Sequence, residues 1–332
     1  MKVVIRTFSV PIERAPREIL IVKPSSLGDI VHTLPAAALI KQRWPSAKLR
    51  WLINAEWAPL LEGNPYVDEV LIFPRRDFRG ARGTLRIAPW ARSLRDRVDA
   101  DLVLDFQGLL RSALIAKLCR GAGGRIVGLG DAREGARFFY DQRVDVSDCA
   151  HAVDRYLALV RAIRIAVPDT LAWPLPEGVS PARFDAVERF VVLHPFSRGR
   201  GKSLSLSDVE TFCRALAPMR VVIAGQSKEP IAHIPNVINL LNHTTLLELV
   251  WLLRHAAFVV SVDSGPMHIA AALGAPLIAI HTWSDPAKVG PYNRDAWVWK
   301  DGALAQVLDL AHRHSAPDIP ALAAFVRKRV LA

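Results

Sequence analysis

Cysteine is scarce in this sequence of 332 residues, which contains only Cys119, Cys149 and Cys213. The number is odd, the spacings are wide, and no C-x-x-C pair or Cys/His ligand spacing accompanies them. This pattern argues against a disulfide framework and against a structural zinc site. We interpret the three residues as reduced thiols of a cytoplasmic protein.

Long hydrophobic runs are also missing, because no apolar stretch reaches the roughly 18 residues that a membrane-spanning helix requires. Arg6, Pro11 and Pro16 interrupt the first 17 residues, so this segment lacks the apolar centre of a signal peptide. We interpret residues 1–17 as a loosely attached lead-in and expect neither export nor a membrane anchor.

Several catalytic signatures are absent. The sequence contains no G-x-x-x-x-G-K-[ST] phosphate loop, and it contains no G-x-S-x-G elbow of the kind that serine hydrolases use. Glycines at 121–128 do not satisfy G-x-G-x-x-G and precede a predicted strand, so hydride transfer has weak support. Asp99-Ala-Asp101 has the form of a metal-binding D-x-D motif, but we interpret it as a solvated entry to a strand.

Positive charge is abundant, with a formal net charge of +11 and a sequence pI of about 10.0. The surplus is concentrated between Arg75 and Arg97, where eight arginines accompany two aspartates. Such a run predicts an anionic partner, namely nucleic acid, an acidic lipid surface or an acidic substrate. The alternative is a basic face that only serves solubility.

Two successive series of alternating strands and helices account for most of the chain. The first series predicts strands at 18–23, 48–53, 69–73, 102–105 and 125–127 and helices at 29–43, 56–61, 109–119 and 151–165. The second predicts strands at 190–193, 220–224, 258–262 and 277–280 and helices at 207–215, 245–254, 266–273 and 319–330.

Four prolines between Pro168 and Pro181 separate the two series and mark a linker. The predicted fold class is therefore α/β, with two doubly wound Rossmann-like domains, residues 1–170 and 171–332, facing a central cleft. The last helix has no assigned partner, and packing back on the N-terminal domain is one option.

Residues 258–274 combine an apolar strand, a sharp turn and a helix of small residues. Asp263 or Ser264 can cap this helix, and Pro266 suits its first turn because the missing N–H costs nothing there. The N–H groups of such a helix start, with His268 one turn further on, suit a phosphate or diphosphate. Ordinary strand–helix corners of α/β sheets share the same pattern.

The segment KPSSLGDIVHTLP at 23–35 closely resembles the opening motif of glycosyltransferase family 9, the bacterial lipopolysaccharide heptosyltransferases. Residues 258–274, followed by DPAKVGPY at 285–292, resemble the closing motif of that family. The segments between them that resemble heptosyltransferase I are DFQGLLRS at 105–112, DARE at 131–134, FFY at 138–140 and HAVDR at 151–155. The resemblance covers about residues 18 to 300 and implies a GT-B type fold.

The resemblance also implies a metal-independent, inverting transfer that uses no cofactor. The donor is expected to be ADP-L-glycero-β-D-manno-heptose, held by the C-terminal domain, and the acceptor the inner Kdo of lipid A, held by the N-terminal one. Inverting transfer needs one general base, for which Asp29 is our candidate. A helix N-terminus lowers the pKa of this carboxyl and burial raises it, and the sequence leaves the balance open. The alternative is that Asp29 only caps its helix.

In the C-terminal half, Lys202 matches the lysine that holds the diphosphate in this family, assisted by N–H groups of Ser264 and Gly265. Family members follow that lysine with Trp-Pro, whereas Ser203-Leu204 follows here. Arg198 or Arg200 could therefore share its role. The other candidate donor contacts are Ser197, Glu229 for the ribose, Thr244, Asp263 for the heptose hydroxyls or as a helix cap, and His268 for a phosphate.

The candidate acceptor contacts are Ser25, Ser26, Gly28, Arg76, Gln107, Arg111 and Arg133. Kdo carries a carboxylate and lipid A carries phosphates, which arginine forks bind better than lysine point charges. The basic run is expected to meet anionic lipid at the cytoplasmic face of the inner membrane. Phe78, Trp90 and Leu94 are expected to dip into that interface.

Three other functions remain open as alternatives. The first is a family 9 enzyme with another donor or acceptor, such as a heptosyltransferase II-like enzyme or a hexosyltransferase. A nucleic-acid binder fits the basic pI, but no RNP-like strand, helix-turn-helix or zinc finger is present. A two-domain solute-binding protein would need an export signal. We therefore predict a peripheral enzyme, monomeric and without nucleic-acid partners.

Overall fold

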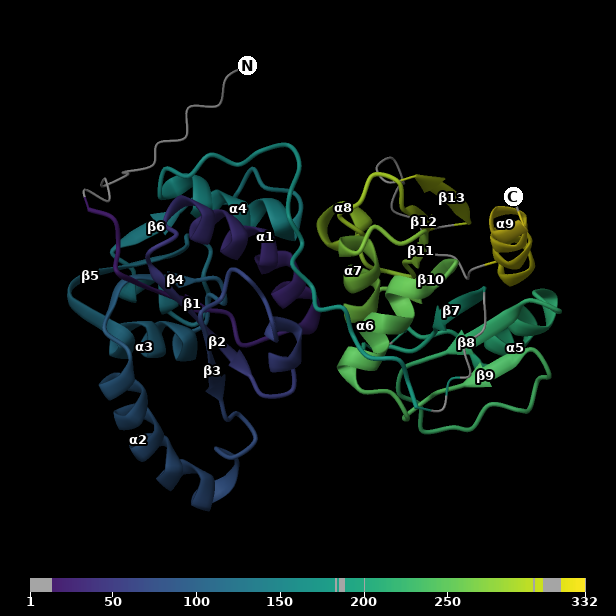
Figure 1. The fold of residues 1–332 in the computed structure, drawn as a ribbon, viewed down its shortest axis with the longest axis horizontal. Coiled ribbons are helices and arrows are strands. Elements are labelled where there is room, and N and C mark those ends of the chain that lie inside the picture. The colour runs from purple at the N-terminus through teal and green to yellow at the C-terminus, as the bar shows by residue number, and fades with distance from the viewer. Residues whose placement is uncertain are drawn as a thin grey trace. The chain divides into compact units, whose positions relative to one another are not determined.

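The chain forms two compact units that divide between Pro174 and Leu175. The computed structural model describes residues 14–182, 184, 189–199, 201–300, 302–306 and 318–331. In the first unit, six parallel strands form a sheet in the order β3-β2-β1-β4-β5-β6 (Figure 1). The strands are β1 Glu18–Val22, β2 Lys48–Asn54, β3 Glu69–Phe73, β4 Ala100–Asp105, β5 Arg120–Leu129 and β6 Gln142–Val144. The helices are α1 Leu27–Arg43, η1 Ala58–Leu61, α2 Gly80–Arg97, α3 Leu110–Cys119, η2 Ala136–Phe139 and α4 Ala152–Ala162.

The second unit has a seven-stranded sheet in the order β13-β12-β11-β10-β7-β8-β9, in which β13 alone runs antiparallel to its neighbour. Its strands are β7 Phe190–His194, β8 Arg220–Ile223, β9 Val237–Asn239, β10 Phe258–Val262, β11 Leu277–Ile280, β12 Trp297–Lys300 and β13 Ala303–Gln306. Its helices are α5 Leu206–Ala215, α6 Leu246–His255, α7 Gly265–Ala272, α8 Pro286–Val289 and α9 Ile319–Leu331.

Both sheets are wound in the same way, so the predicted α/β class with two doubly wound units is confirmed. The strand order reverses between β1 and β4 in the first unit and between β7 and β10 in the second. Ligands of open α/β sheets bind beyond the carboxyl ends of the strands at this reversal. The segments after these four strands are therefore the first places to look for a site.

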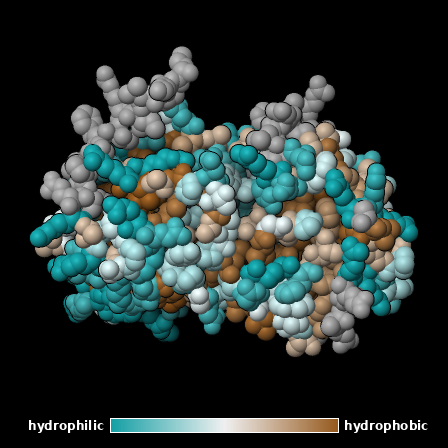
Figure 2. All heavy atoms as spheres, turned by 45° about the horizontal axis from the view of Figure 1, so that its top comes forward, coloured by the Kyte–Doolittle hydropathy of each residue, from teal (hydrophilic) through white to brown (hydrophobic). Residues whose placement is uncertain are grey.

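The central strands are continuous apolar runs because helices cover both faces of each sheet. The side chains of β1 from Ile19 to Val22 are fully buried, and all five residues of β10 are buried as well. Hydrophilic residues cover much of the face shown in Figure 2, with apolar residues gathered in smaller areas. Among the described residues, no helix combines the length and the hydrophobicity needed to cross a bilayer.

Strand β5 is much longer than the predicted segment 125–127, because its glycines continue the strand instead of ending it. A Cβ at Gly121 would lie 2.4 Å from the Asp99 carboxylate, and one at Gly124 would lie 2.4 Å from the Ala100 carbonyl oxygen. These glycines therefore permit a close approach to β4, where the pairing register shifts.

Helix α9 packs on α5 within the second unit. Leu322 and Val326 are fully buried in the core of that unit. Phe325 contacts the rings of Phe258 and Trp297, with centroid separations of 6.5 and 4.8 Å. The apolar stripe of α9 thus completes one face of the second sheet.

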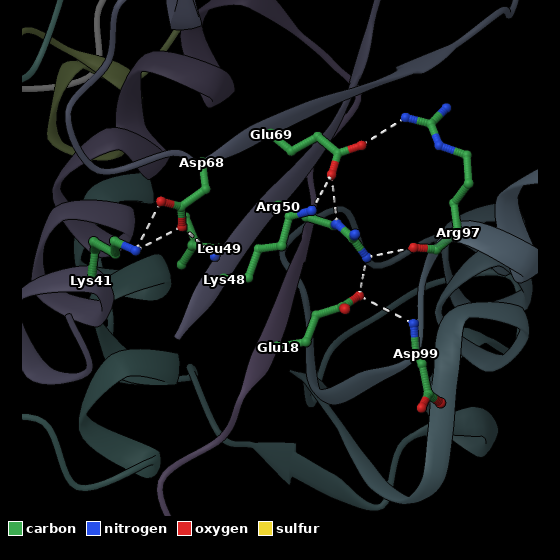
Figure 3. A network of polar contacts seen from close by, with 9 residues as sticks. All are labelled: Glu18, Lys41, Lys48, Leu49, Arg50, Asp68, Glu69, Arg97 and Asp99. Atoms are coloured by element: carbon green, nitrogen blue, oxygen red, sulfur yellow. Dashed lines mark hydrogen bonds and ion pairs between the residues drawn. The ribbon is translucent and has the colours of Figure 1, made fainter. Parts of the chain in front are cut away.

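A network of charged side chains joins the amino ends of β1, β2 and β3, opposite the carboxyl edge (Figure 3). At its centre, the Arg50 Nε donates to Glu69 at 2.9 Å and the Arg50 guanidinium pairs with Glu18. Arg97, at the end of α2, donates to Glu69 at 2.6 Å, and Lys48 lies 2.8 Å from the same carboxylate. This network fixes the strand ends and the end of α2.

Glu69 carries a testable consequence for stability. Burial raises the pKa of its carboxyl, but hydrogen bonds from Lys48, Arg97 and Arg50 outweigh burial and lower that pKa to about 2, from an ordinary value of 4.5. A carboxyl whose pKa is lower in the folded state stabilises the fold above its unfolded pKa, and this contribution disappears as the pH falls toward 2.

We therefore expect Glu69→Gln to lower the free energy of unfolding by about 2 kcal/mol at pH 7 and by much less near pH 3. Urea unfolding at the two pH values measures both numbers. The exposed Glu62, changed to Gln, is the matched control and should leave stability within about 0.5 kcal/mol. An equal loss at both pH values for Glu69→Gln would contradict this account.

Candidate functional site

The first half of the candidate site lies where β1 turns into α1. Ser26 is the N-cap of α1, and Asp29 is the third residue of the helix. The Oδ2 atom of Asp29 accepts hydrogen bonds from the Ser26 hydroxyl at 2.6 Å and from the Ser26 N–H at 3.1 Å. The helix therefore begins at Leu27, before the predicted start at Asp29. The alternative that Asp29 is the N-cap is also wrong, because Ser26 has that position. The Asp29 carboxylate folds back over the turn instead.

The other oxygen of this carboxylate meets two side chains that our sequence analysis missed. The Tyr156 hydroxyl, on α4, donates to Oδ1 of Asp29 at 2.8 Å, and the Lys23 Nζ lies 3.9 Å from that oxygen. Lys23 is buried, donates to the Phe106 carbonyl at 3.0 Å and lies 4.8 Å from the centre of the Tyr156 ring. Tyr156 directly follows the HAVDR segment, and Lys23 opens the KPSSLGD segment.

The electrostatic balance at Asp29 favours the ionised form. Burial raises the pKa of this carboxyl, but the Lys23 ammonium and the hydrogen bonds from Ser26 and Tyr156 outweigh burial and hold the pKa well below its ordinary range. Burial lowers the pKa of Lys23, while Asp29 and Asp105 oppose that shift. Asp29 is thus deprotonated at neutral pH, as a general base must be before it accepts a proton.

Tyr156→Phe tests this balance directly. The variant keeps the ring and removes the hydroxyl that stabilises the Asp29 carboxylate, so we expect the pKa of Asp29 to rise. The acidic limb of the pH profile for kcat/KM should then move to higher pH. As a control, Tyr66→Phe changes a hydroxyl that accepts only a long 3.4 Å bond from Gln42 and should leave the profile unchanged. An acidic limb that stays in place in Tyr156→Phe would refute the role of this hydroxyl.

A small, open hollow lies beside this turn in the first unit. Its lining brings together three of the predicted acceptor contacts, Ser25, Gln107 and Arg111. The Ser25 N–H donates to Oε1 of Gln107 at 3.3 Å, and the Arg111 guanidinium lies 5.6 Å from the centre of the Phe73 ring. Arg75, which we did not single out beforehand, also lines the hollow.

A buried carboxylate fixes the turn that carries Gln107. Asp105 is fully buried at the end of β4 and accepts hydrogen bonds from the backbone N–H groups of Gln107 and Gly108 at 2.9 and 3.1 Å. The hydroxyls of Ser112 and Tyr140 also donate to it, at 2.8 and 2.7 Å. Burial raises the pKa of this carboxyl, although the four hydrogen bonds act to lower it. Asp105 therefore orders the loop that forms one wall of the hollow.

The remaining predicted acceptor contacts lie nearby in different surroundings. Arg76 is exposed and pairs with Glu56 at 2.9 Å. The exposed Arg133 is held by its backbone N–H, which donates to the Gly108 carbonyl at 2.8 Å. Gly28 is buried in the first turn of α1.

The three residues that we expected to enter a membrane pack against the first unit, where Leu94 is buried and Phe78 and Trp90 are partly buried. Phe78, Trp90 and Phe73 make edge contacts with centroid separations from 5.3 to 5.7 Å. Leu94 is 4% exposed in the same core cluster. Most of the basic run lies in α2, which sequence reasoning missed because arginines dominate it, and the inner face of this helix packs Trp90 and Leu94 against the unit.

The second half of the candidate site lies at the corresponding place in the second unit. Lys202 follows β7, Asp263 follows β10, and the Lys202 Nζ lies 2.5 Å from Oδ2 of Asp263. The ammonium also lies 5.0 Å from the centre of the Trp283 ring. Burial raises the pKa of Asp263, but the hydrogen bonds from Lys202 and Ser284 outweigh burial and lower it. A partly buried ion pair therefore holds Lys202 at the start of α7.

The N-cap of α7 is Ser264. Of the two residues that we predicted as possible caps, Asp263 is therefore excluded. The Ser264 hydroxyl does not bond to the helix and instead lies 3.3 Å from Ser261 Oγ and 3.3 Å from Nδ1 of His194. Burial lowers the pKa of His194 to about 4, so this imidazole is neutral. The positive end of α7, which Gly265 begins, thus carries no capping side chain and suits an anion.

The loop of Lys202 is closed by local hydrogen bonds. The Ser197 N–H donates to Ser203 Oγ at 3.0 Å, and that hydroxyl donates back to the Ser197 carbonyl at 3.2 Å. The serine that departs from the family pattern after Lys202 therefore ties the loop together. Arg198 is exposed, and Arg200 lies outside the described residues.

The candidate nucleoside contacts follow β8 and β9 at the same edge of this sheet. Glu229 is exposed, and its backbone N–H donates to Ser227 Oγ at 3.1 Å. Ser227 exchanges hydrogen bonds of 3.1 and 2.8 Å with Asn242, two residues before Thr244. The loops that carry Glu229 and Thr244 are thus tied together. His268 is buried in α7.

Within the described parts of the chain, no three His, Cys, Asp or Glu side chains gather as a metal site would require. Asp101 of the D-x-D segment accepts from the backbone N–H groups of Arg17 and Glu18, at 2.6 and 3.2 Å, at the amino end of β1. This segment therefore lies at the amino edge of the first sheet, opposite the turn that carries Asp29.

Comparison with known proteins identifies relatives along most of the chain. The model of glycosyltransferase family 9 (heptosyltransferase) matches residues 87–191 and 217–307. Lipopolysaccharide heptosyltransferase 1 of Escherichia coli K12 is 28% identical over 295 residues, 84% of this chain and 92% of that protein. Lipopolysaccharide heptosyltransferase 1 of Pseudomonas aeruginosa is 28% identical over 301 residues, 83% of this chain and 81% of that protein.

Solved structures agree on the fold. E. coli heptosyltransferase WaaC with ADP superimposes with a TM-score of 0.73 at 24% identity, covering 94% of this chain and 99% of that one. E. coli ADP-heptose lps heptosyltransferase II gives a TM-score of 0.73 at 24% identity, covering 95% and 98%. These matches confirm the predicted GT-B type architecture.

Proposed function

The chain belongs to glycosyltransferase family 9, and from this premise we propose that it transfers L-glycero-D-manno-heptose from ADP-heptose to the Kdo of lipid A. The relatives in E. coli K12 and P. aeruginosa carry the name lipopolysaccharide heptosyltransferase 1, and one of the similar solved structures, WaaC, is described with ADP. The proposed reaction is the first heptose addition of the lipopolysaccharide inner core.

The observation that carries the proposal is the chemistry at Asp29. An ionised carboxylate stands at the reversal point of the first sheet, oriented by Tyr156, Ser26 and Lys23. Beside it lies a hollow lined by arginines, which suits a substrate that carries a carboxylate and phosphates. The first unit therefore has the features of an acceptor-binding domain.

In the proposed reaction, Asp29 takes the proton of the acceptor hydroxyl as that oxygen attacks the anomeric carbon. The bond to the diphosphate breaks, and the negative charge that develops on the leaving ADP is stabilised by Lys202 and by the N–H groups at the start of α7. A single displacement of this kind inverts the anomeric centre. The second unit would hold the nucleotide sugar, with Glu229 and Thr244 toward the nucleoside and Ser197 and His268 toward the phosphates.

A different family 9 donor or acceptor is the second candidate function, because one of the similar solved structures is a heptosyltransferase II. The residues of the two half-sites do not separate the alternatives. We also propose that the enzyme acts as a monomer at the cytoplasmic face of the inner membrane, since its acceptor is a lipid. No nucleic-acid partner is proposed.

A transfer assay tests the proposed function. The purified protein is incubated with ADP-heptose or an ADP-hexose and with Kdo-lipid A from which the fatty acyl chains have been removed, and the product mass is recorded. We expect addition of one heptose with ADP-heptose and at least about a hundredfold slower transfer from ADP-hexoses. Equal rates with an ADP-hexose would favour the hexosyltransferase alternative, and no transfer from ADP-heptose would refute the proposal.

The same assay tests metal independence. If Lys202 and the α7 N-terminus take the place of a metal at the diphosphate, EDTA should leave the transfer rate within about twofold of the untreated enzyme. Full loss of activity in EDTA, restored by added Mg²⁺, would contradict this part of the mechanism.

A further inference from the structure

Three large apolar side chains of the first unit are exposed along α3 and η2. Leu110 is 38% exposed, Leu114 is 50% exposed and Phe138 is 69% exposed. Leu110 and Leu114 are one helical turn apart on α3, so they project from the same side of that helix. Phe138 lies on η2, which packs against α3. We call these three residues and the arginines around them the α3–η2 face.

The position of η2 beside the start of α3 is fixed by hydrogen bonds. The backbone N–H of Arg133 donates to the Gly108 carbonyl at 2.8 Å, and the N–H of Leu110 donates to the Glu134 carboxylate at 3.3 Å. Ala136 belongs to the same core cluster as Ala113, from the inner side of α3. The exposed apolar residues of the two segments therefore form one continuous part of the surface.

Basic side chains surround this apolar group. The guanidinium groups of Arg137 and Arg143 lie 5.2 and 5.7 Å from the centre of the Phe138 ring. Arg111, Arg133 and Lys117 are exposed on or beside the same two segments. The acidic side chains here are Glu134, which accepts from the first turn of α3, and Asp131, which pairs with Arg155 at 2.6 Å. Positive charge therefore predominates around the exposed leucines and the phenylalanine.

We propose that the α3–η2 face docks on an anionic lipid bilayer, with Leu110, Leu114 and Phe138 entering the interfacial region and the arginines contacting lipid phosphates. Apolar side chains gain free energy at the acyl boundary, and each nearby arginine adds attraction to anionic headgroups. This inference rests on the proposed function, because it explains how the enzyme meets a lipid-borne acceptor. Leu110, Leu114 and Phe138 are exposed, so they can enter a bilayer more readily than Phe78, Trp90 and Leu94, which pack against the core of the unit.

The location of the face relative to the hollow supports this occupant. Leu109 and Arg111, on either side of Leu110, line the hollow that we assign to the acceptor. A lipid acceptor has its sugar joined to chains that stay in the bilayer, so the docking surface has to adjoin the sugar site. Helix α2, which carries most of the basic run, packs against α3 and adds positive charge to this side of the unit (Figure 1).

Vesicle sedimentation tests the inference without donor or acceptor. The full-length protein is mixed with phosphatidylcholine vesicles, either pure or containing about 30% phosphatidylglycerol, and the bound fraction is measured. We expect binding to the anionic vesicles that is at least about tenfold stronger than binding to the neutral ones. Leu114→Gln combined with Phe138→Gln should reduce the partition onto anionic vesicles at least about tenfold.

The matched control combines Val179→Gln with Leu331→Gln, which change two exposed apolar residues of the second unit, and it should bind vesicles like the wild type. The Leu114/Phe138 variant should also transfer heptose to the water-soluble, deacylated acceptor at the wild-type rate. Wild-type vesicle binding by that variant would overturn the docking surface and leave the proposed reaction intact. Loss of transfer by wild-type enzyme on the soluble acceptor would refute the reaction alone.

Discussion

Asp29→Asn is expected to reduce kcat by at least about 10³-fold while ADP binding stays within about twofold of wild type. The amide keeps the size of the carboxylate and cannot take a proton from the acceptor hydroxyl, so the loss falls on the chemical step. ADP affinity should persist, because Asp29 belongs to the first unit and the candidate diphosphate contacts belong to the second. Steady-state kinetics and calorimetric titration with ADP measure the two effects.

Asp148 supplies the matched control, since it is an exposed aspartate of the same unit. Asp148→Asn should change kcat by less than about twofold. Thermal unfolding of Asp29→Asn checks that the fold survives the loss of the ion pair with Lys23. Transfer by folded Asp29→Asn at the wild-type rate would exclude this residue as the base.

Lys202→Met is expected to lower kcat about 10²- to 10³-fold and to weaken ADP binding about tenfold. In the proposed reaction, the ammonium stabilises charge that grows on the diphosphate as the glycosidic bond breaks, so its removal should cost more in the transition state than in the ground state. The same change leaves the Asp263 carboxylate, which is 6% exposed, without its cation. Some loss of stability should therefore accompany the loss of activity.

The double variant Lys202→Met/Asp263→Asn separates these two effects. Removing the unpaired charge should recover stability, and activity should stay low because the diphosphate still lacks its cation. Lys328→Met, an exposed lysine on α9, is the control for charge removal elsewhere in the unit. Full activity in the double variant would show that Lys202 acts only by neutralising Asp263.

The fold was predictable because its central strands are unbroken apolar runs. The central strands β10 and β11 begin and end at the predicted residues, since buried parallel strands leave a clear signal. The edge strand β3 also has the predicted bounds, although it is only partly buried. The strands β6, β9, β12 and β13 were missed, because each has only three or four residues and lies at or next to a sheet edge, where the apolar signal is short. Helix α2 was missed for the opposite reason, as its arginines hide the few residues that pack inward.

The candidate site was predictable only as separate segments. The motifs identified Asp29, Gln107 and Arg111 because each lies in the loop or the first helical turn that follows a strand, where sequence order reflects position. The partners of Asp29 were harder to find. Tyr156 is 127 residues away in the chain, and its hydrogen bond depends on how α4 packs beside α1. The depressed pKa of Asp29 follows from that packing, which spacing along the chain does not encode.

The anomeric configuration of the product tests the central claim most directly, because that claim is a single displacement assisted by one base. The β-linked donor ADP-L-glycero-β-D-manno-heptose is turned over on deacylated Kdo-lipid A, and NMR spectroscopy assigns the new linkage. Attack by a hydroxyl that Asp29 deprotonates predicts an α-linked heptose. A β-linked product would require two displacements and would contradict the mechanism.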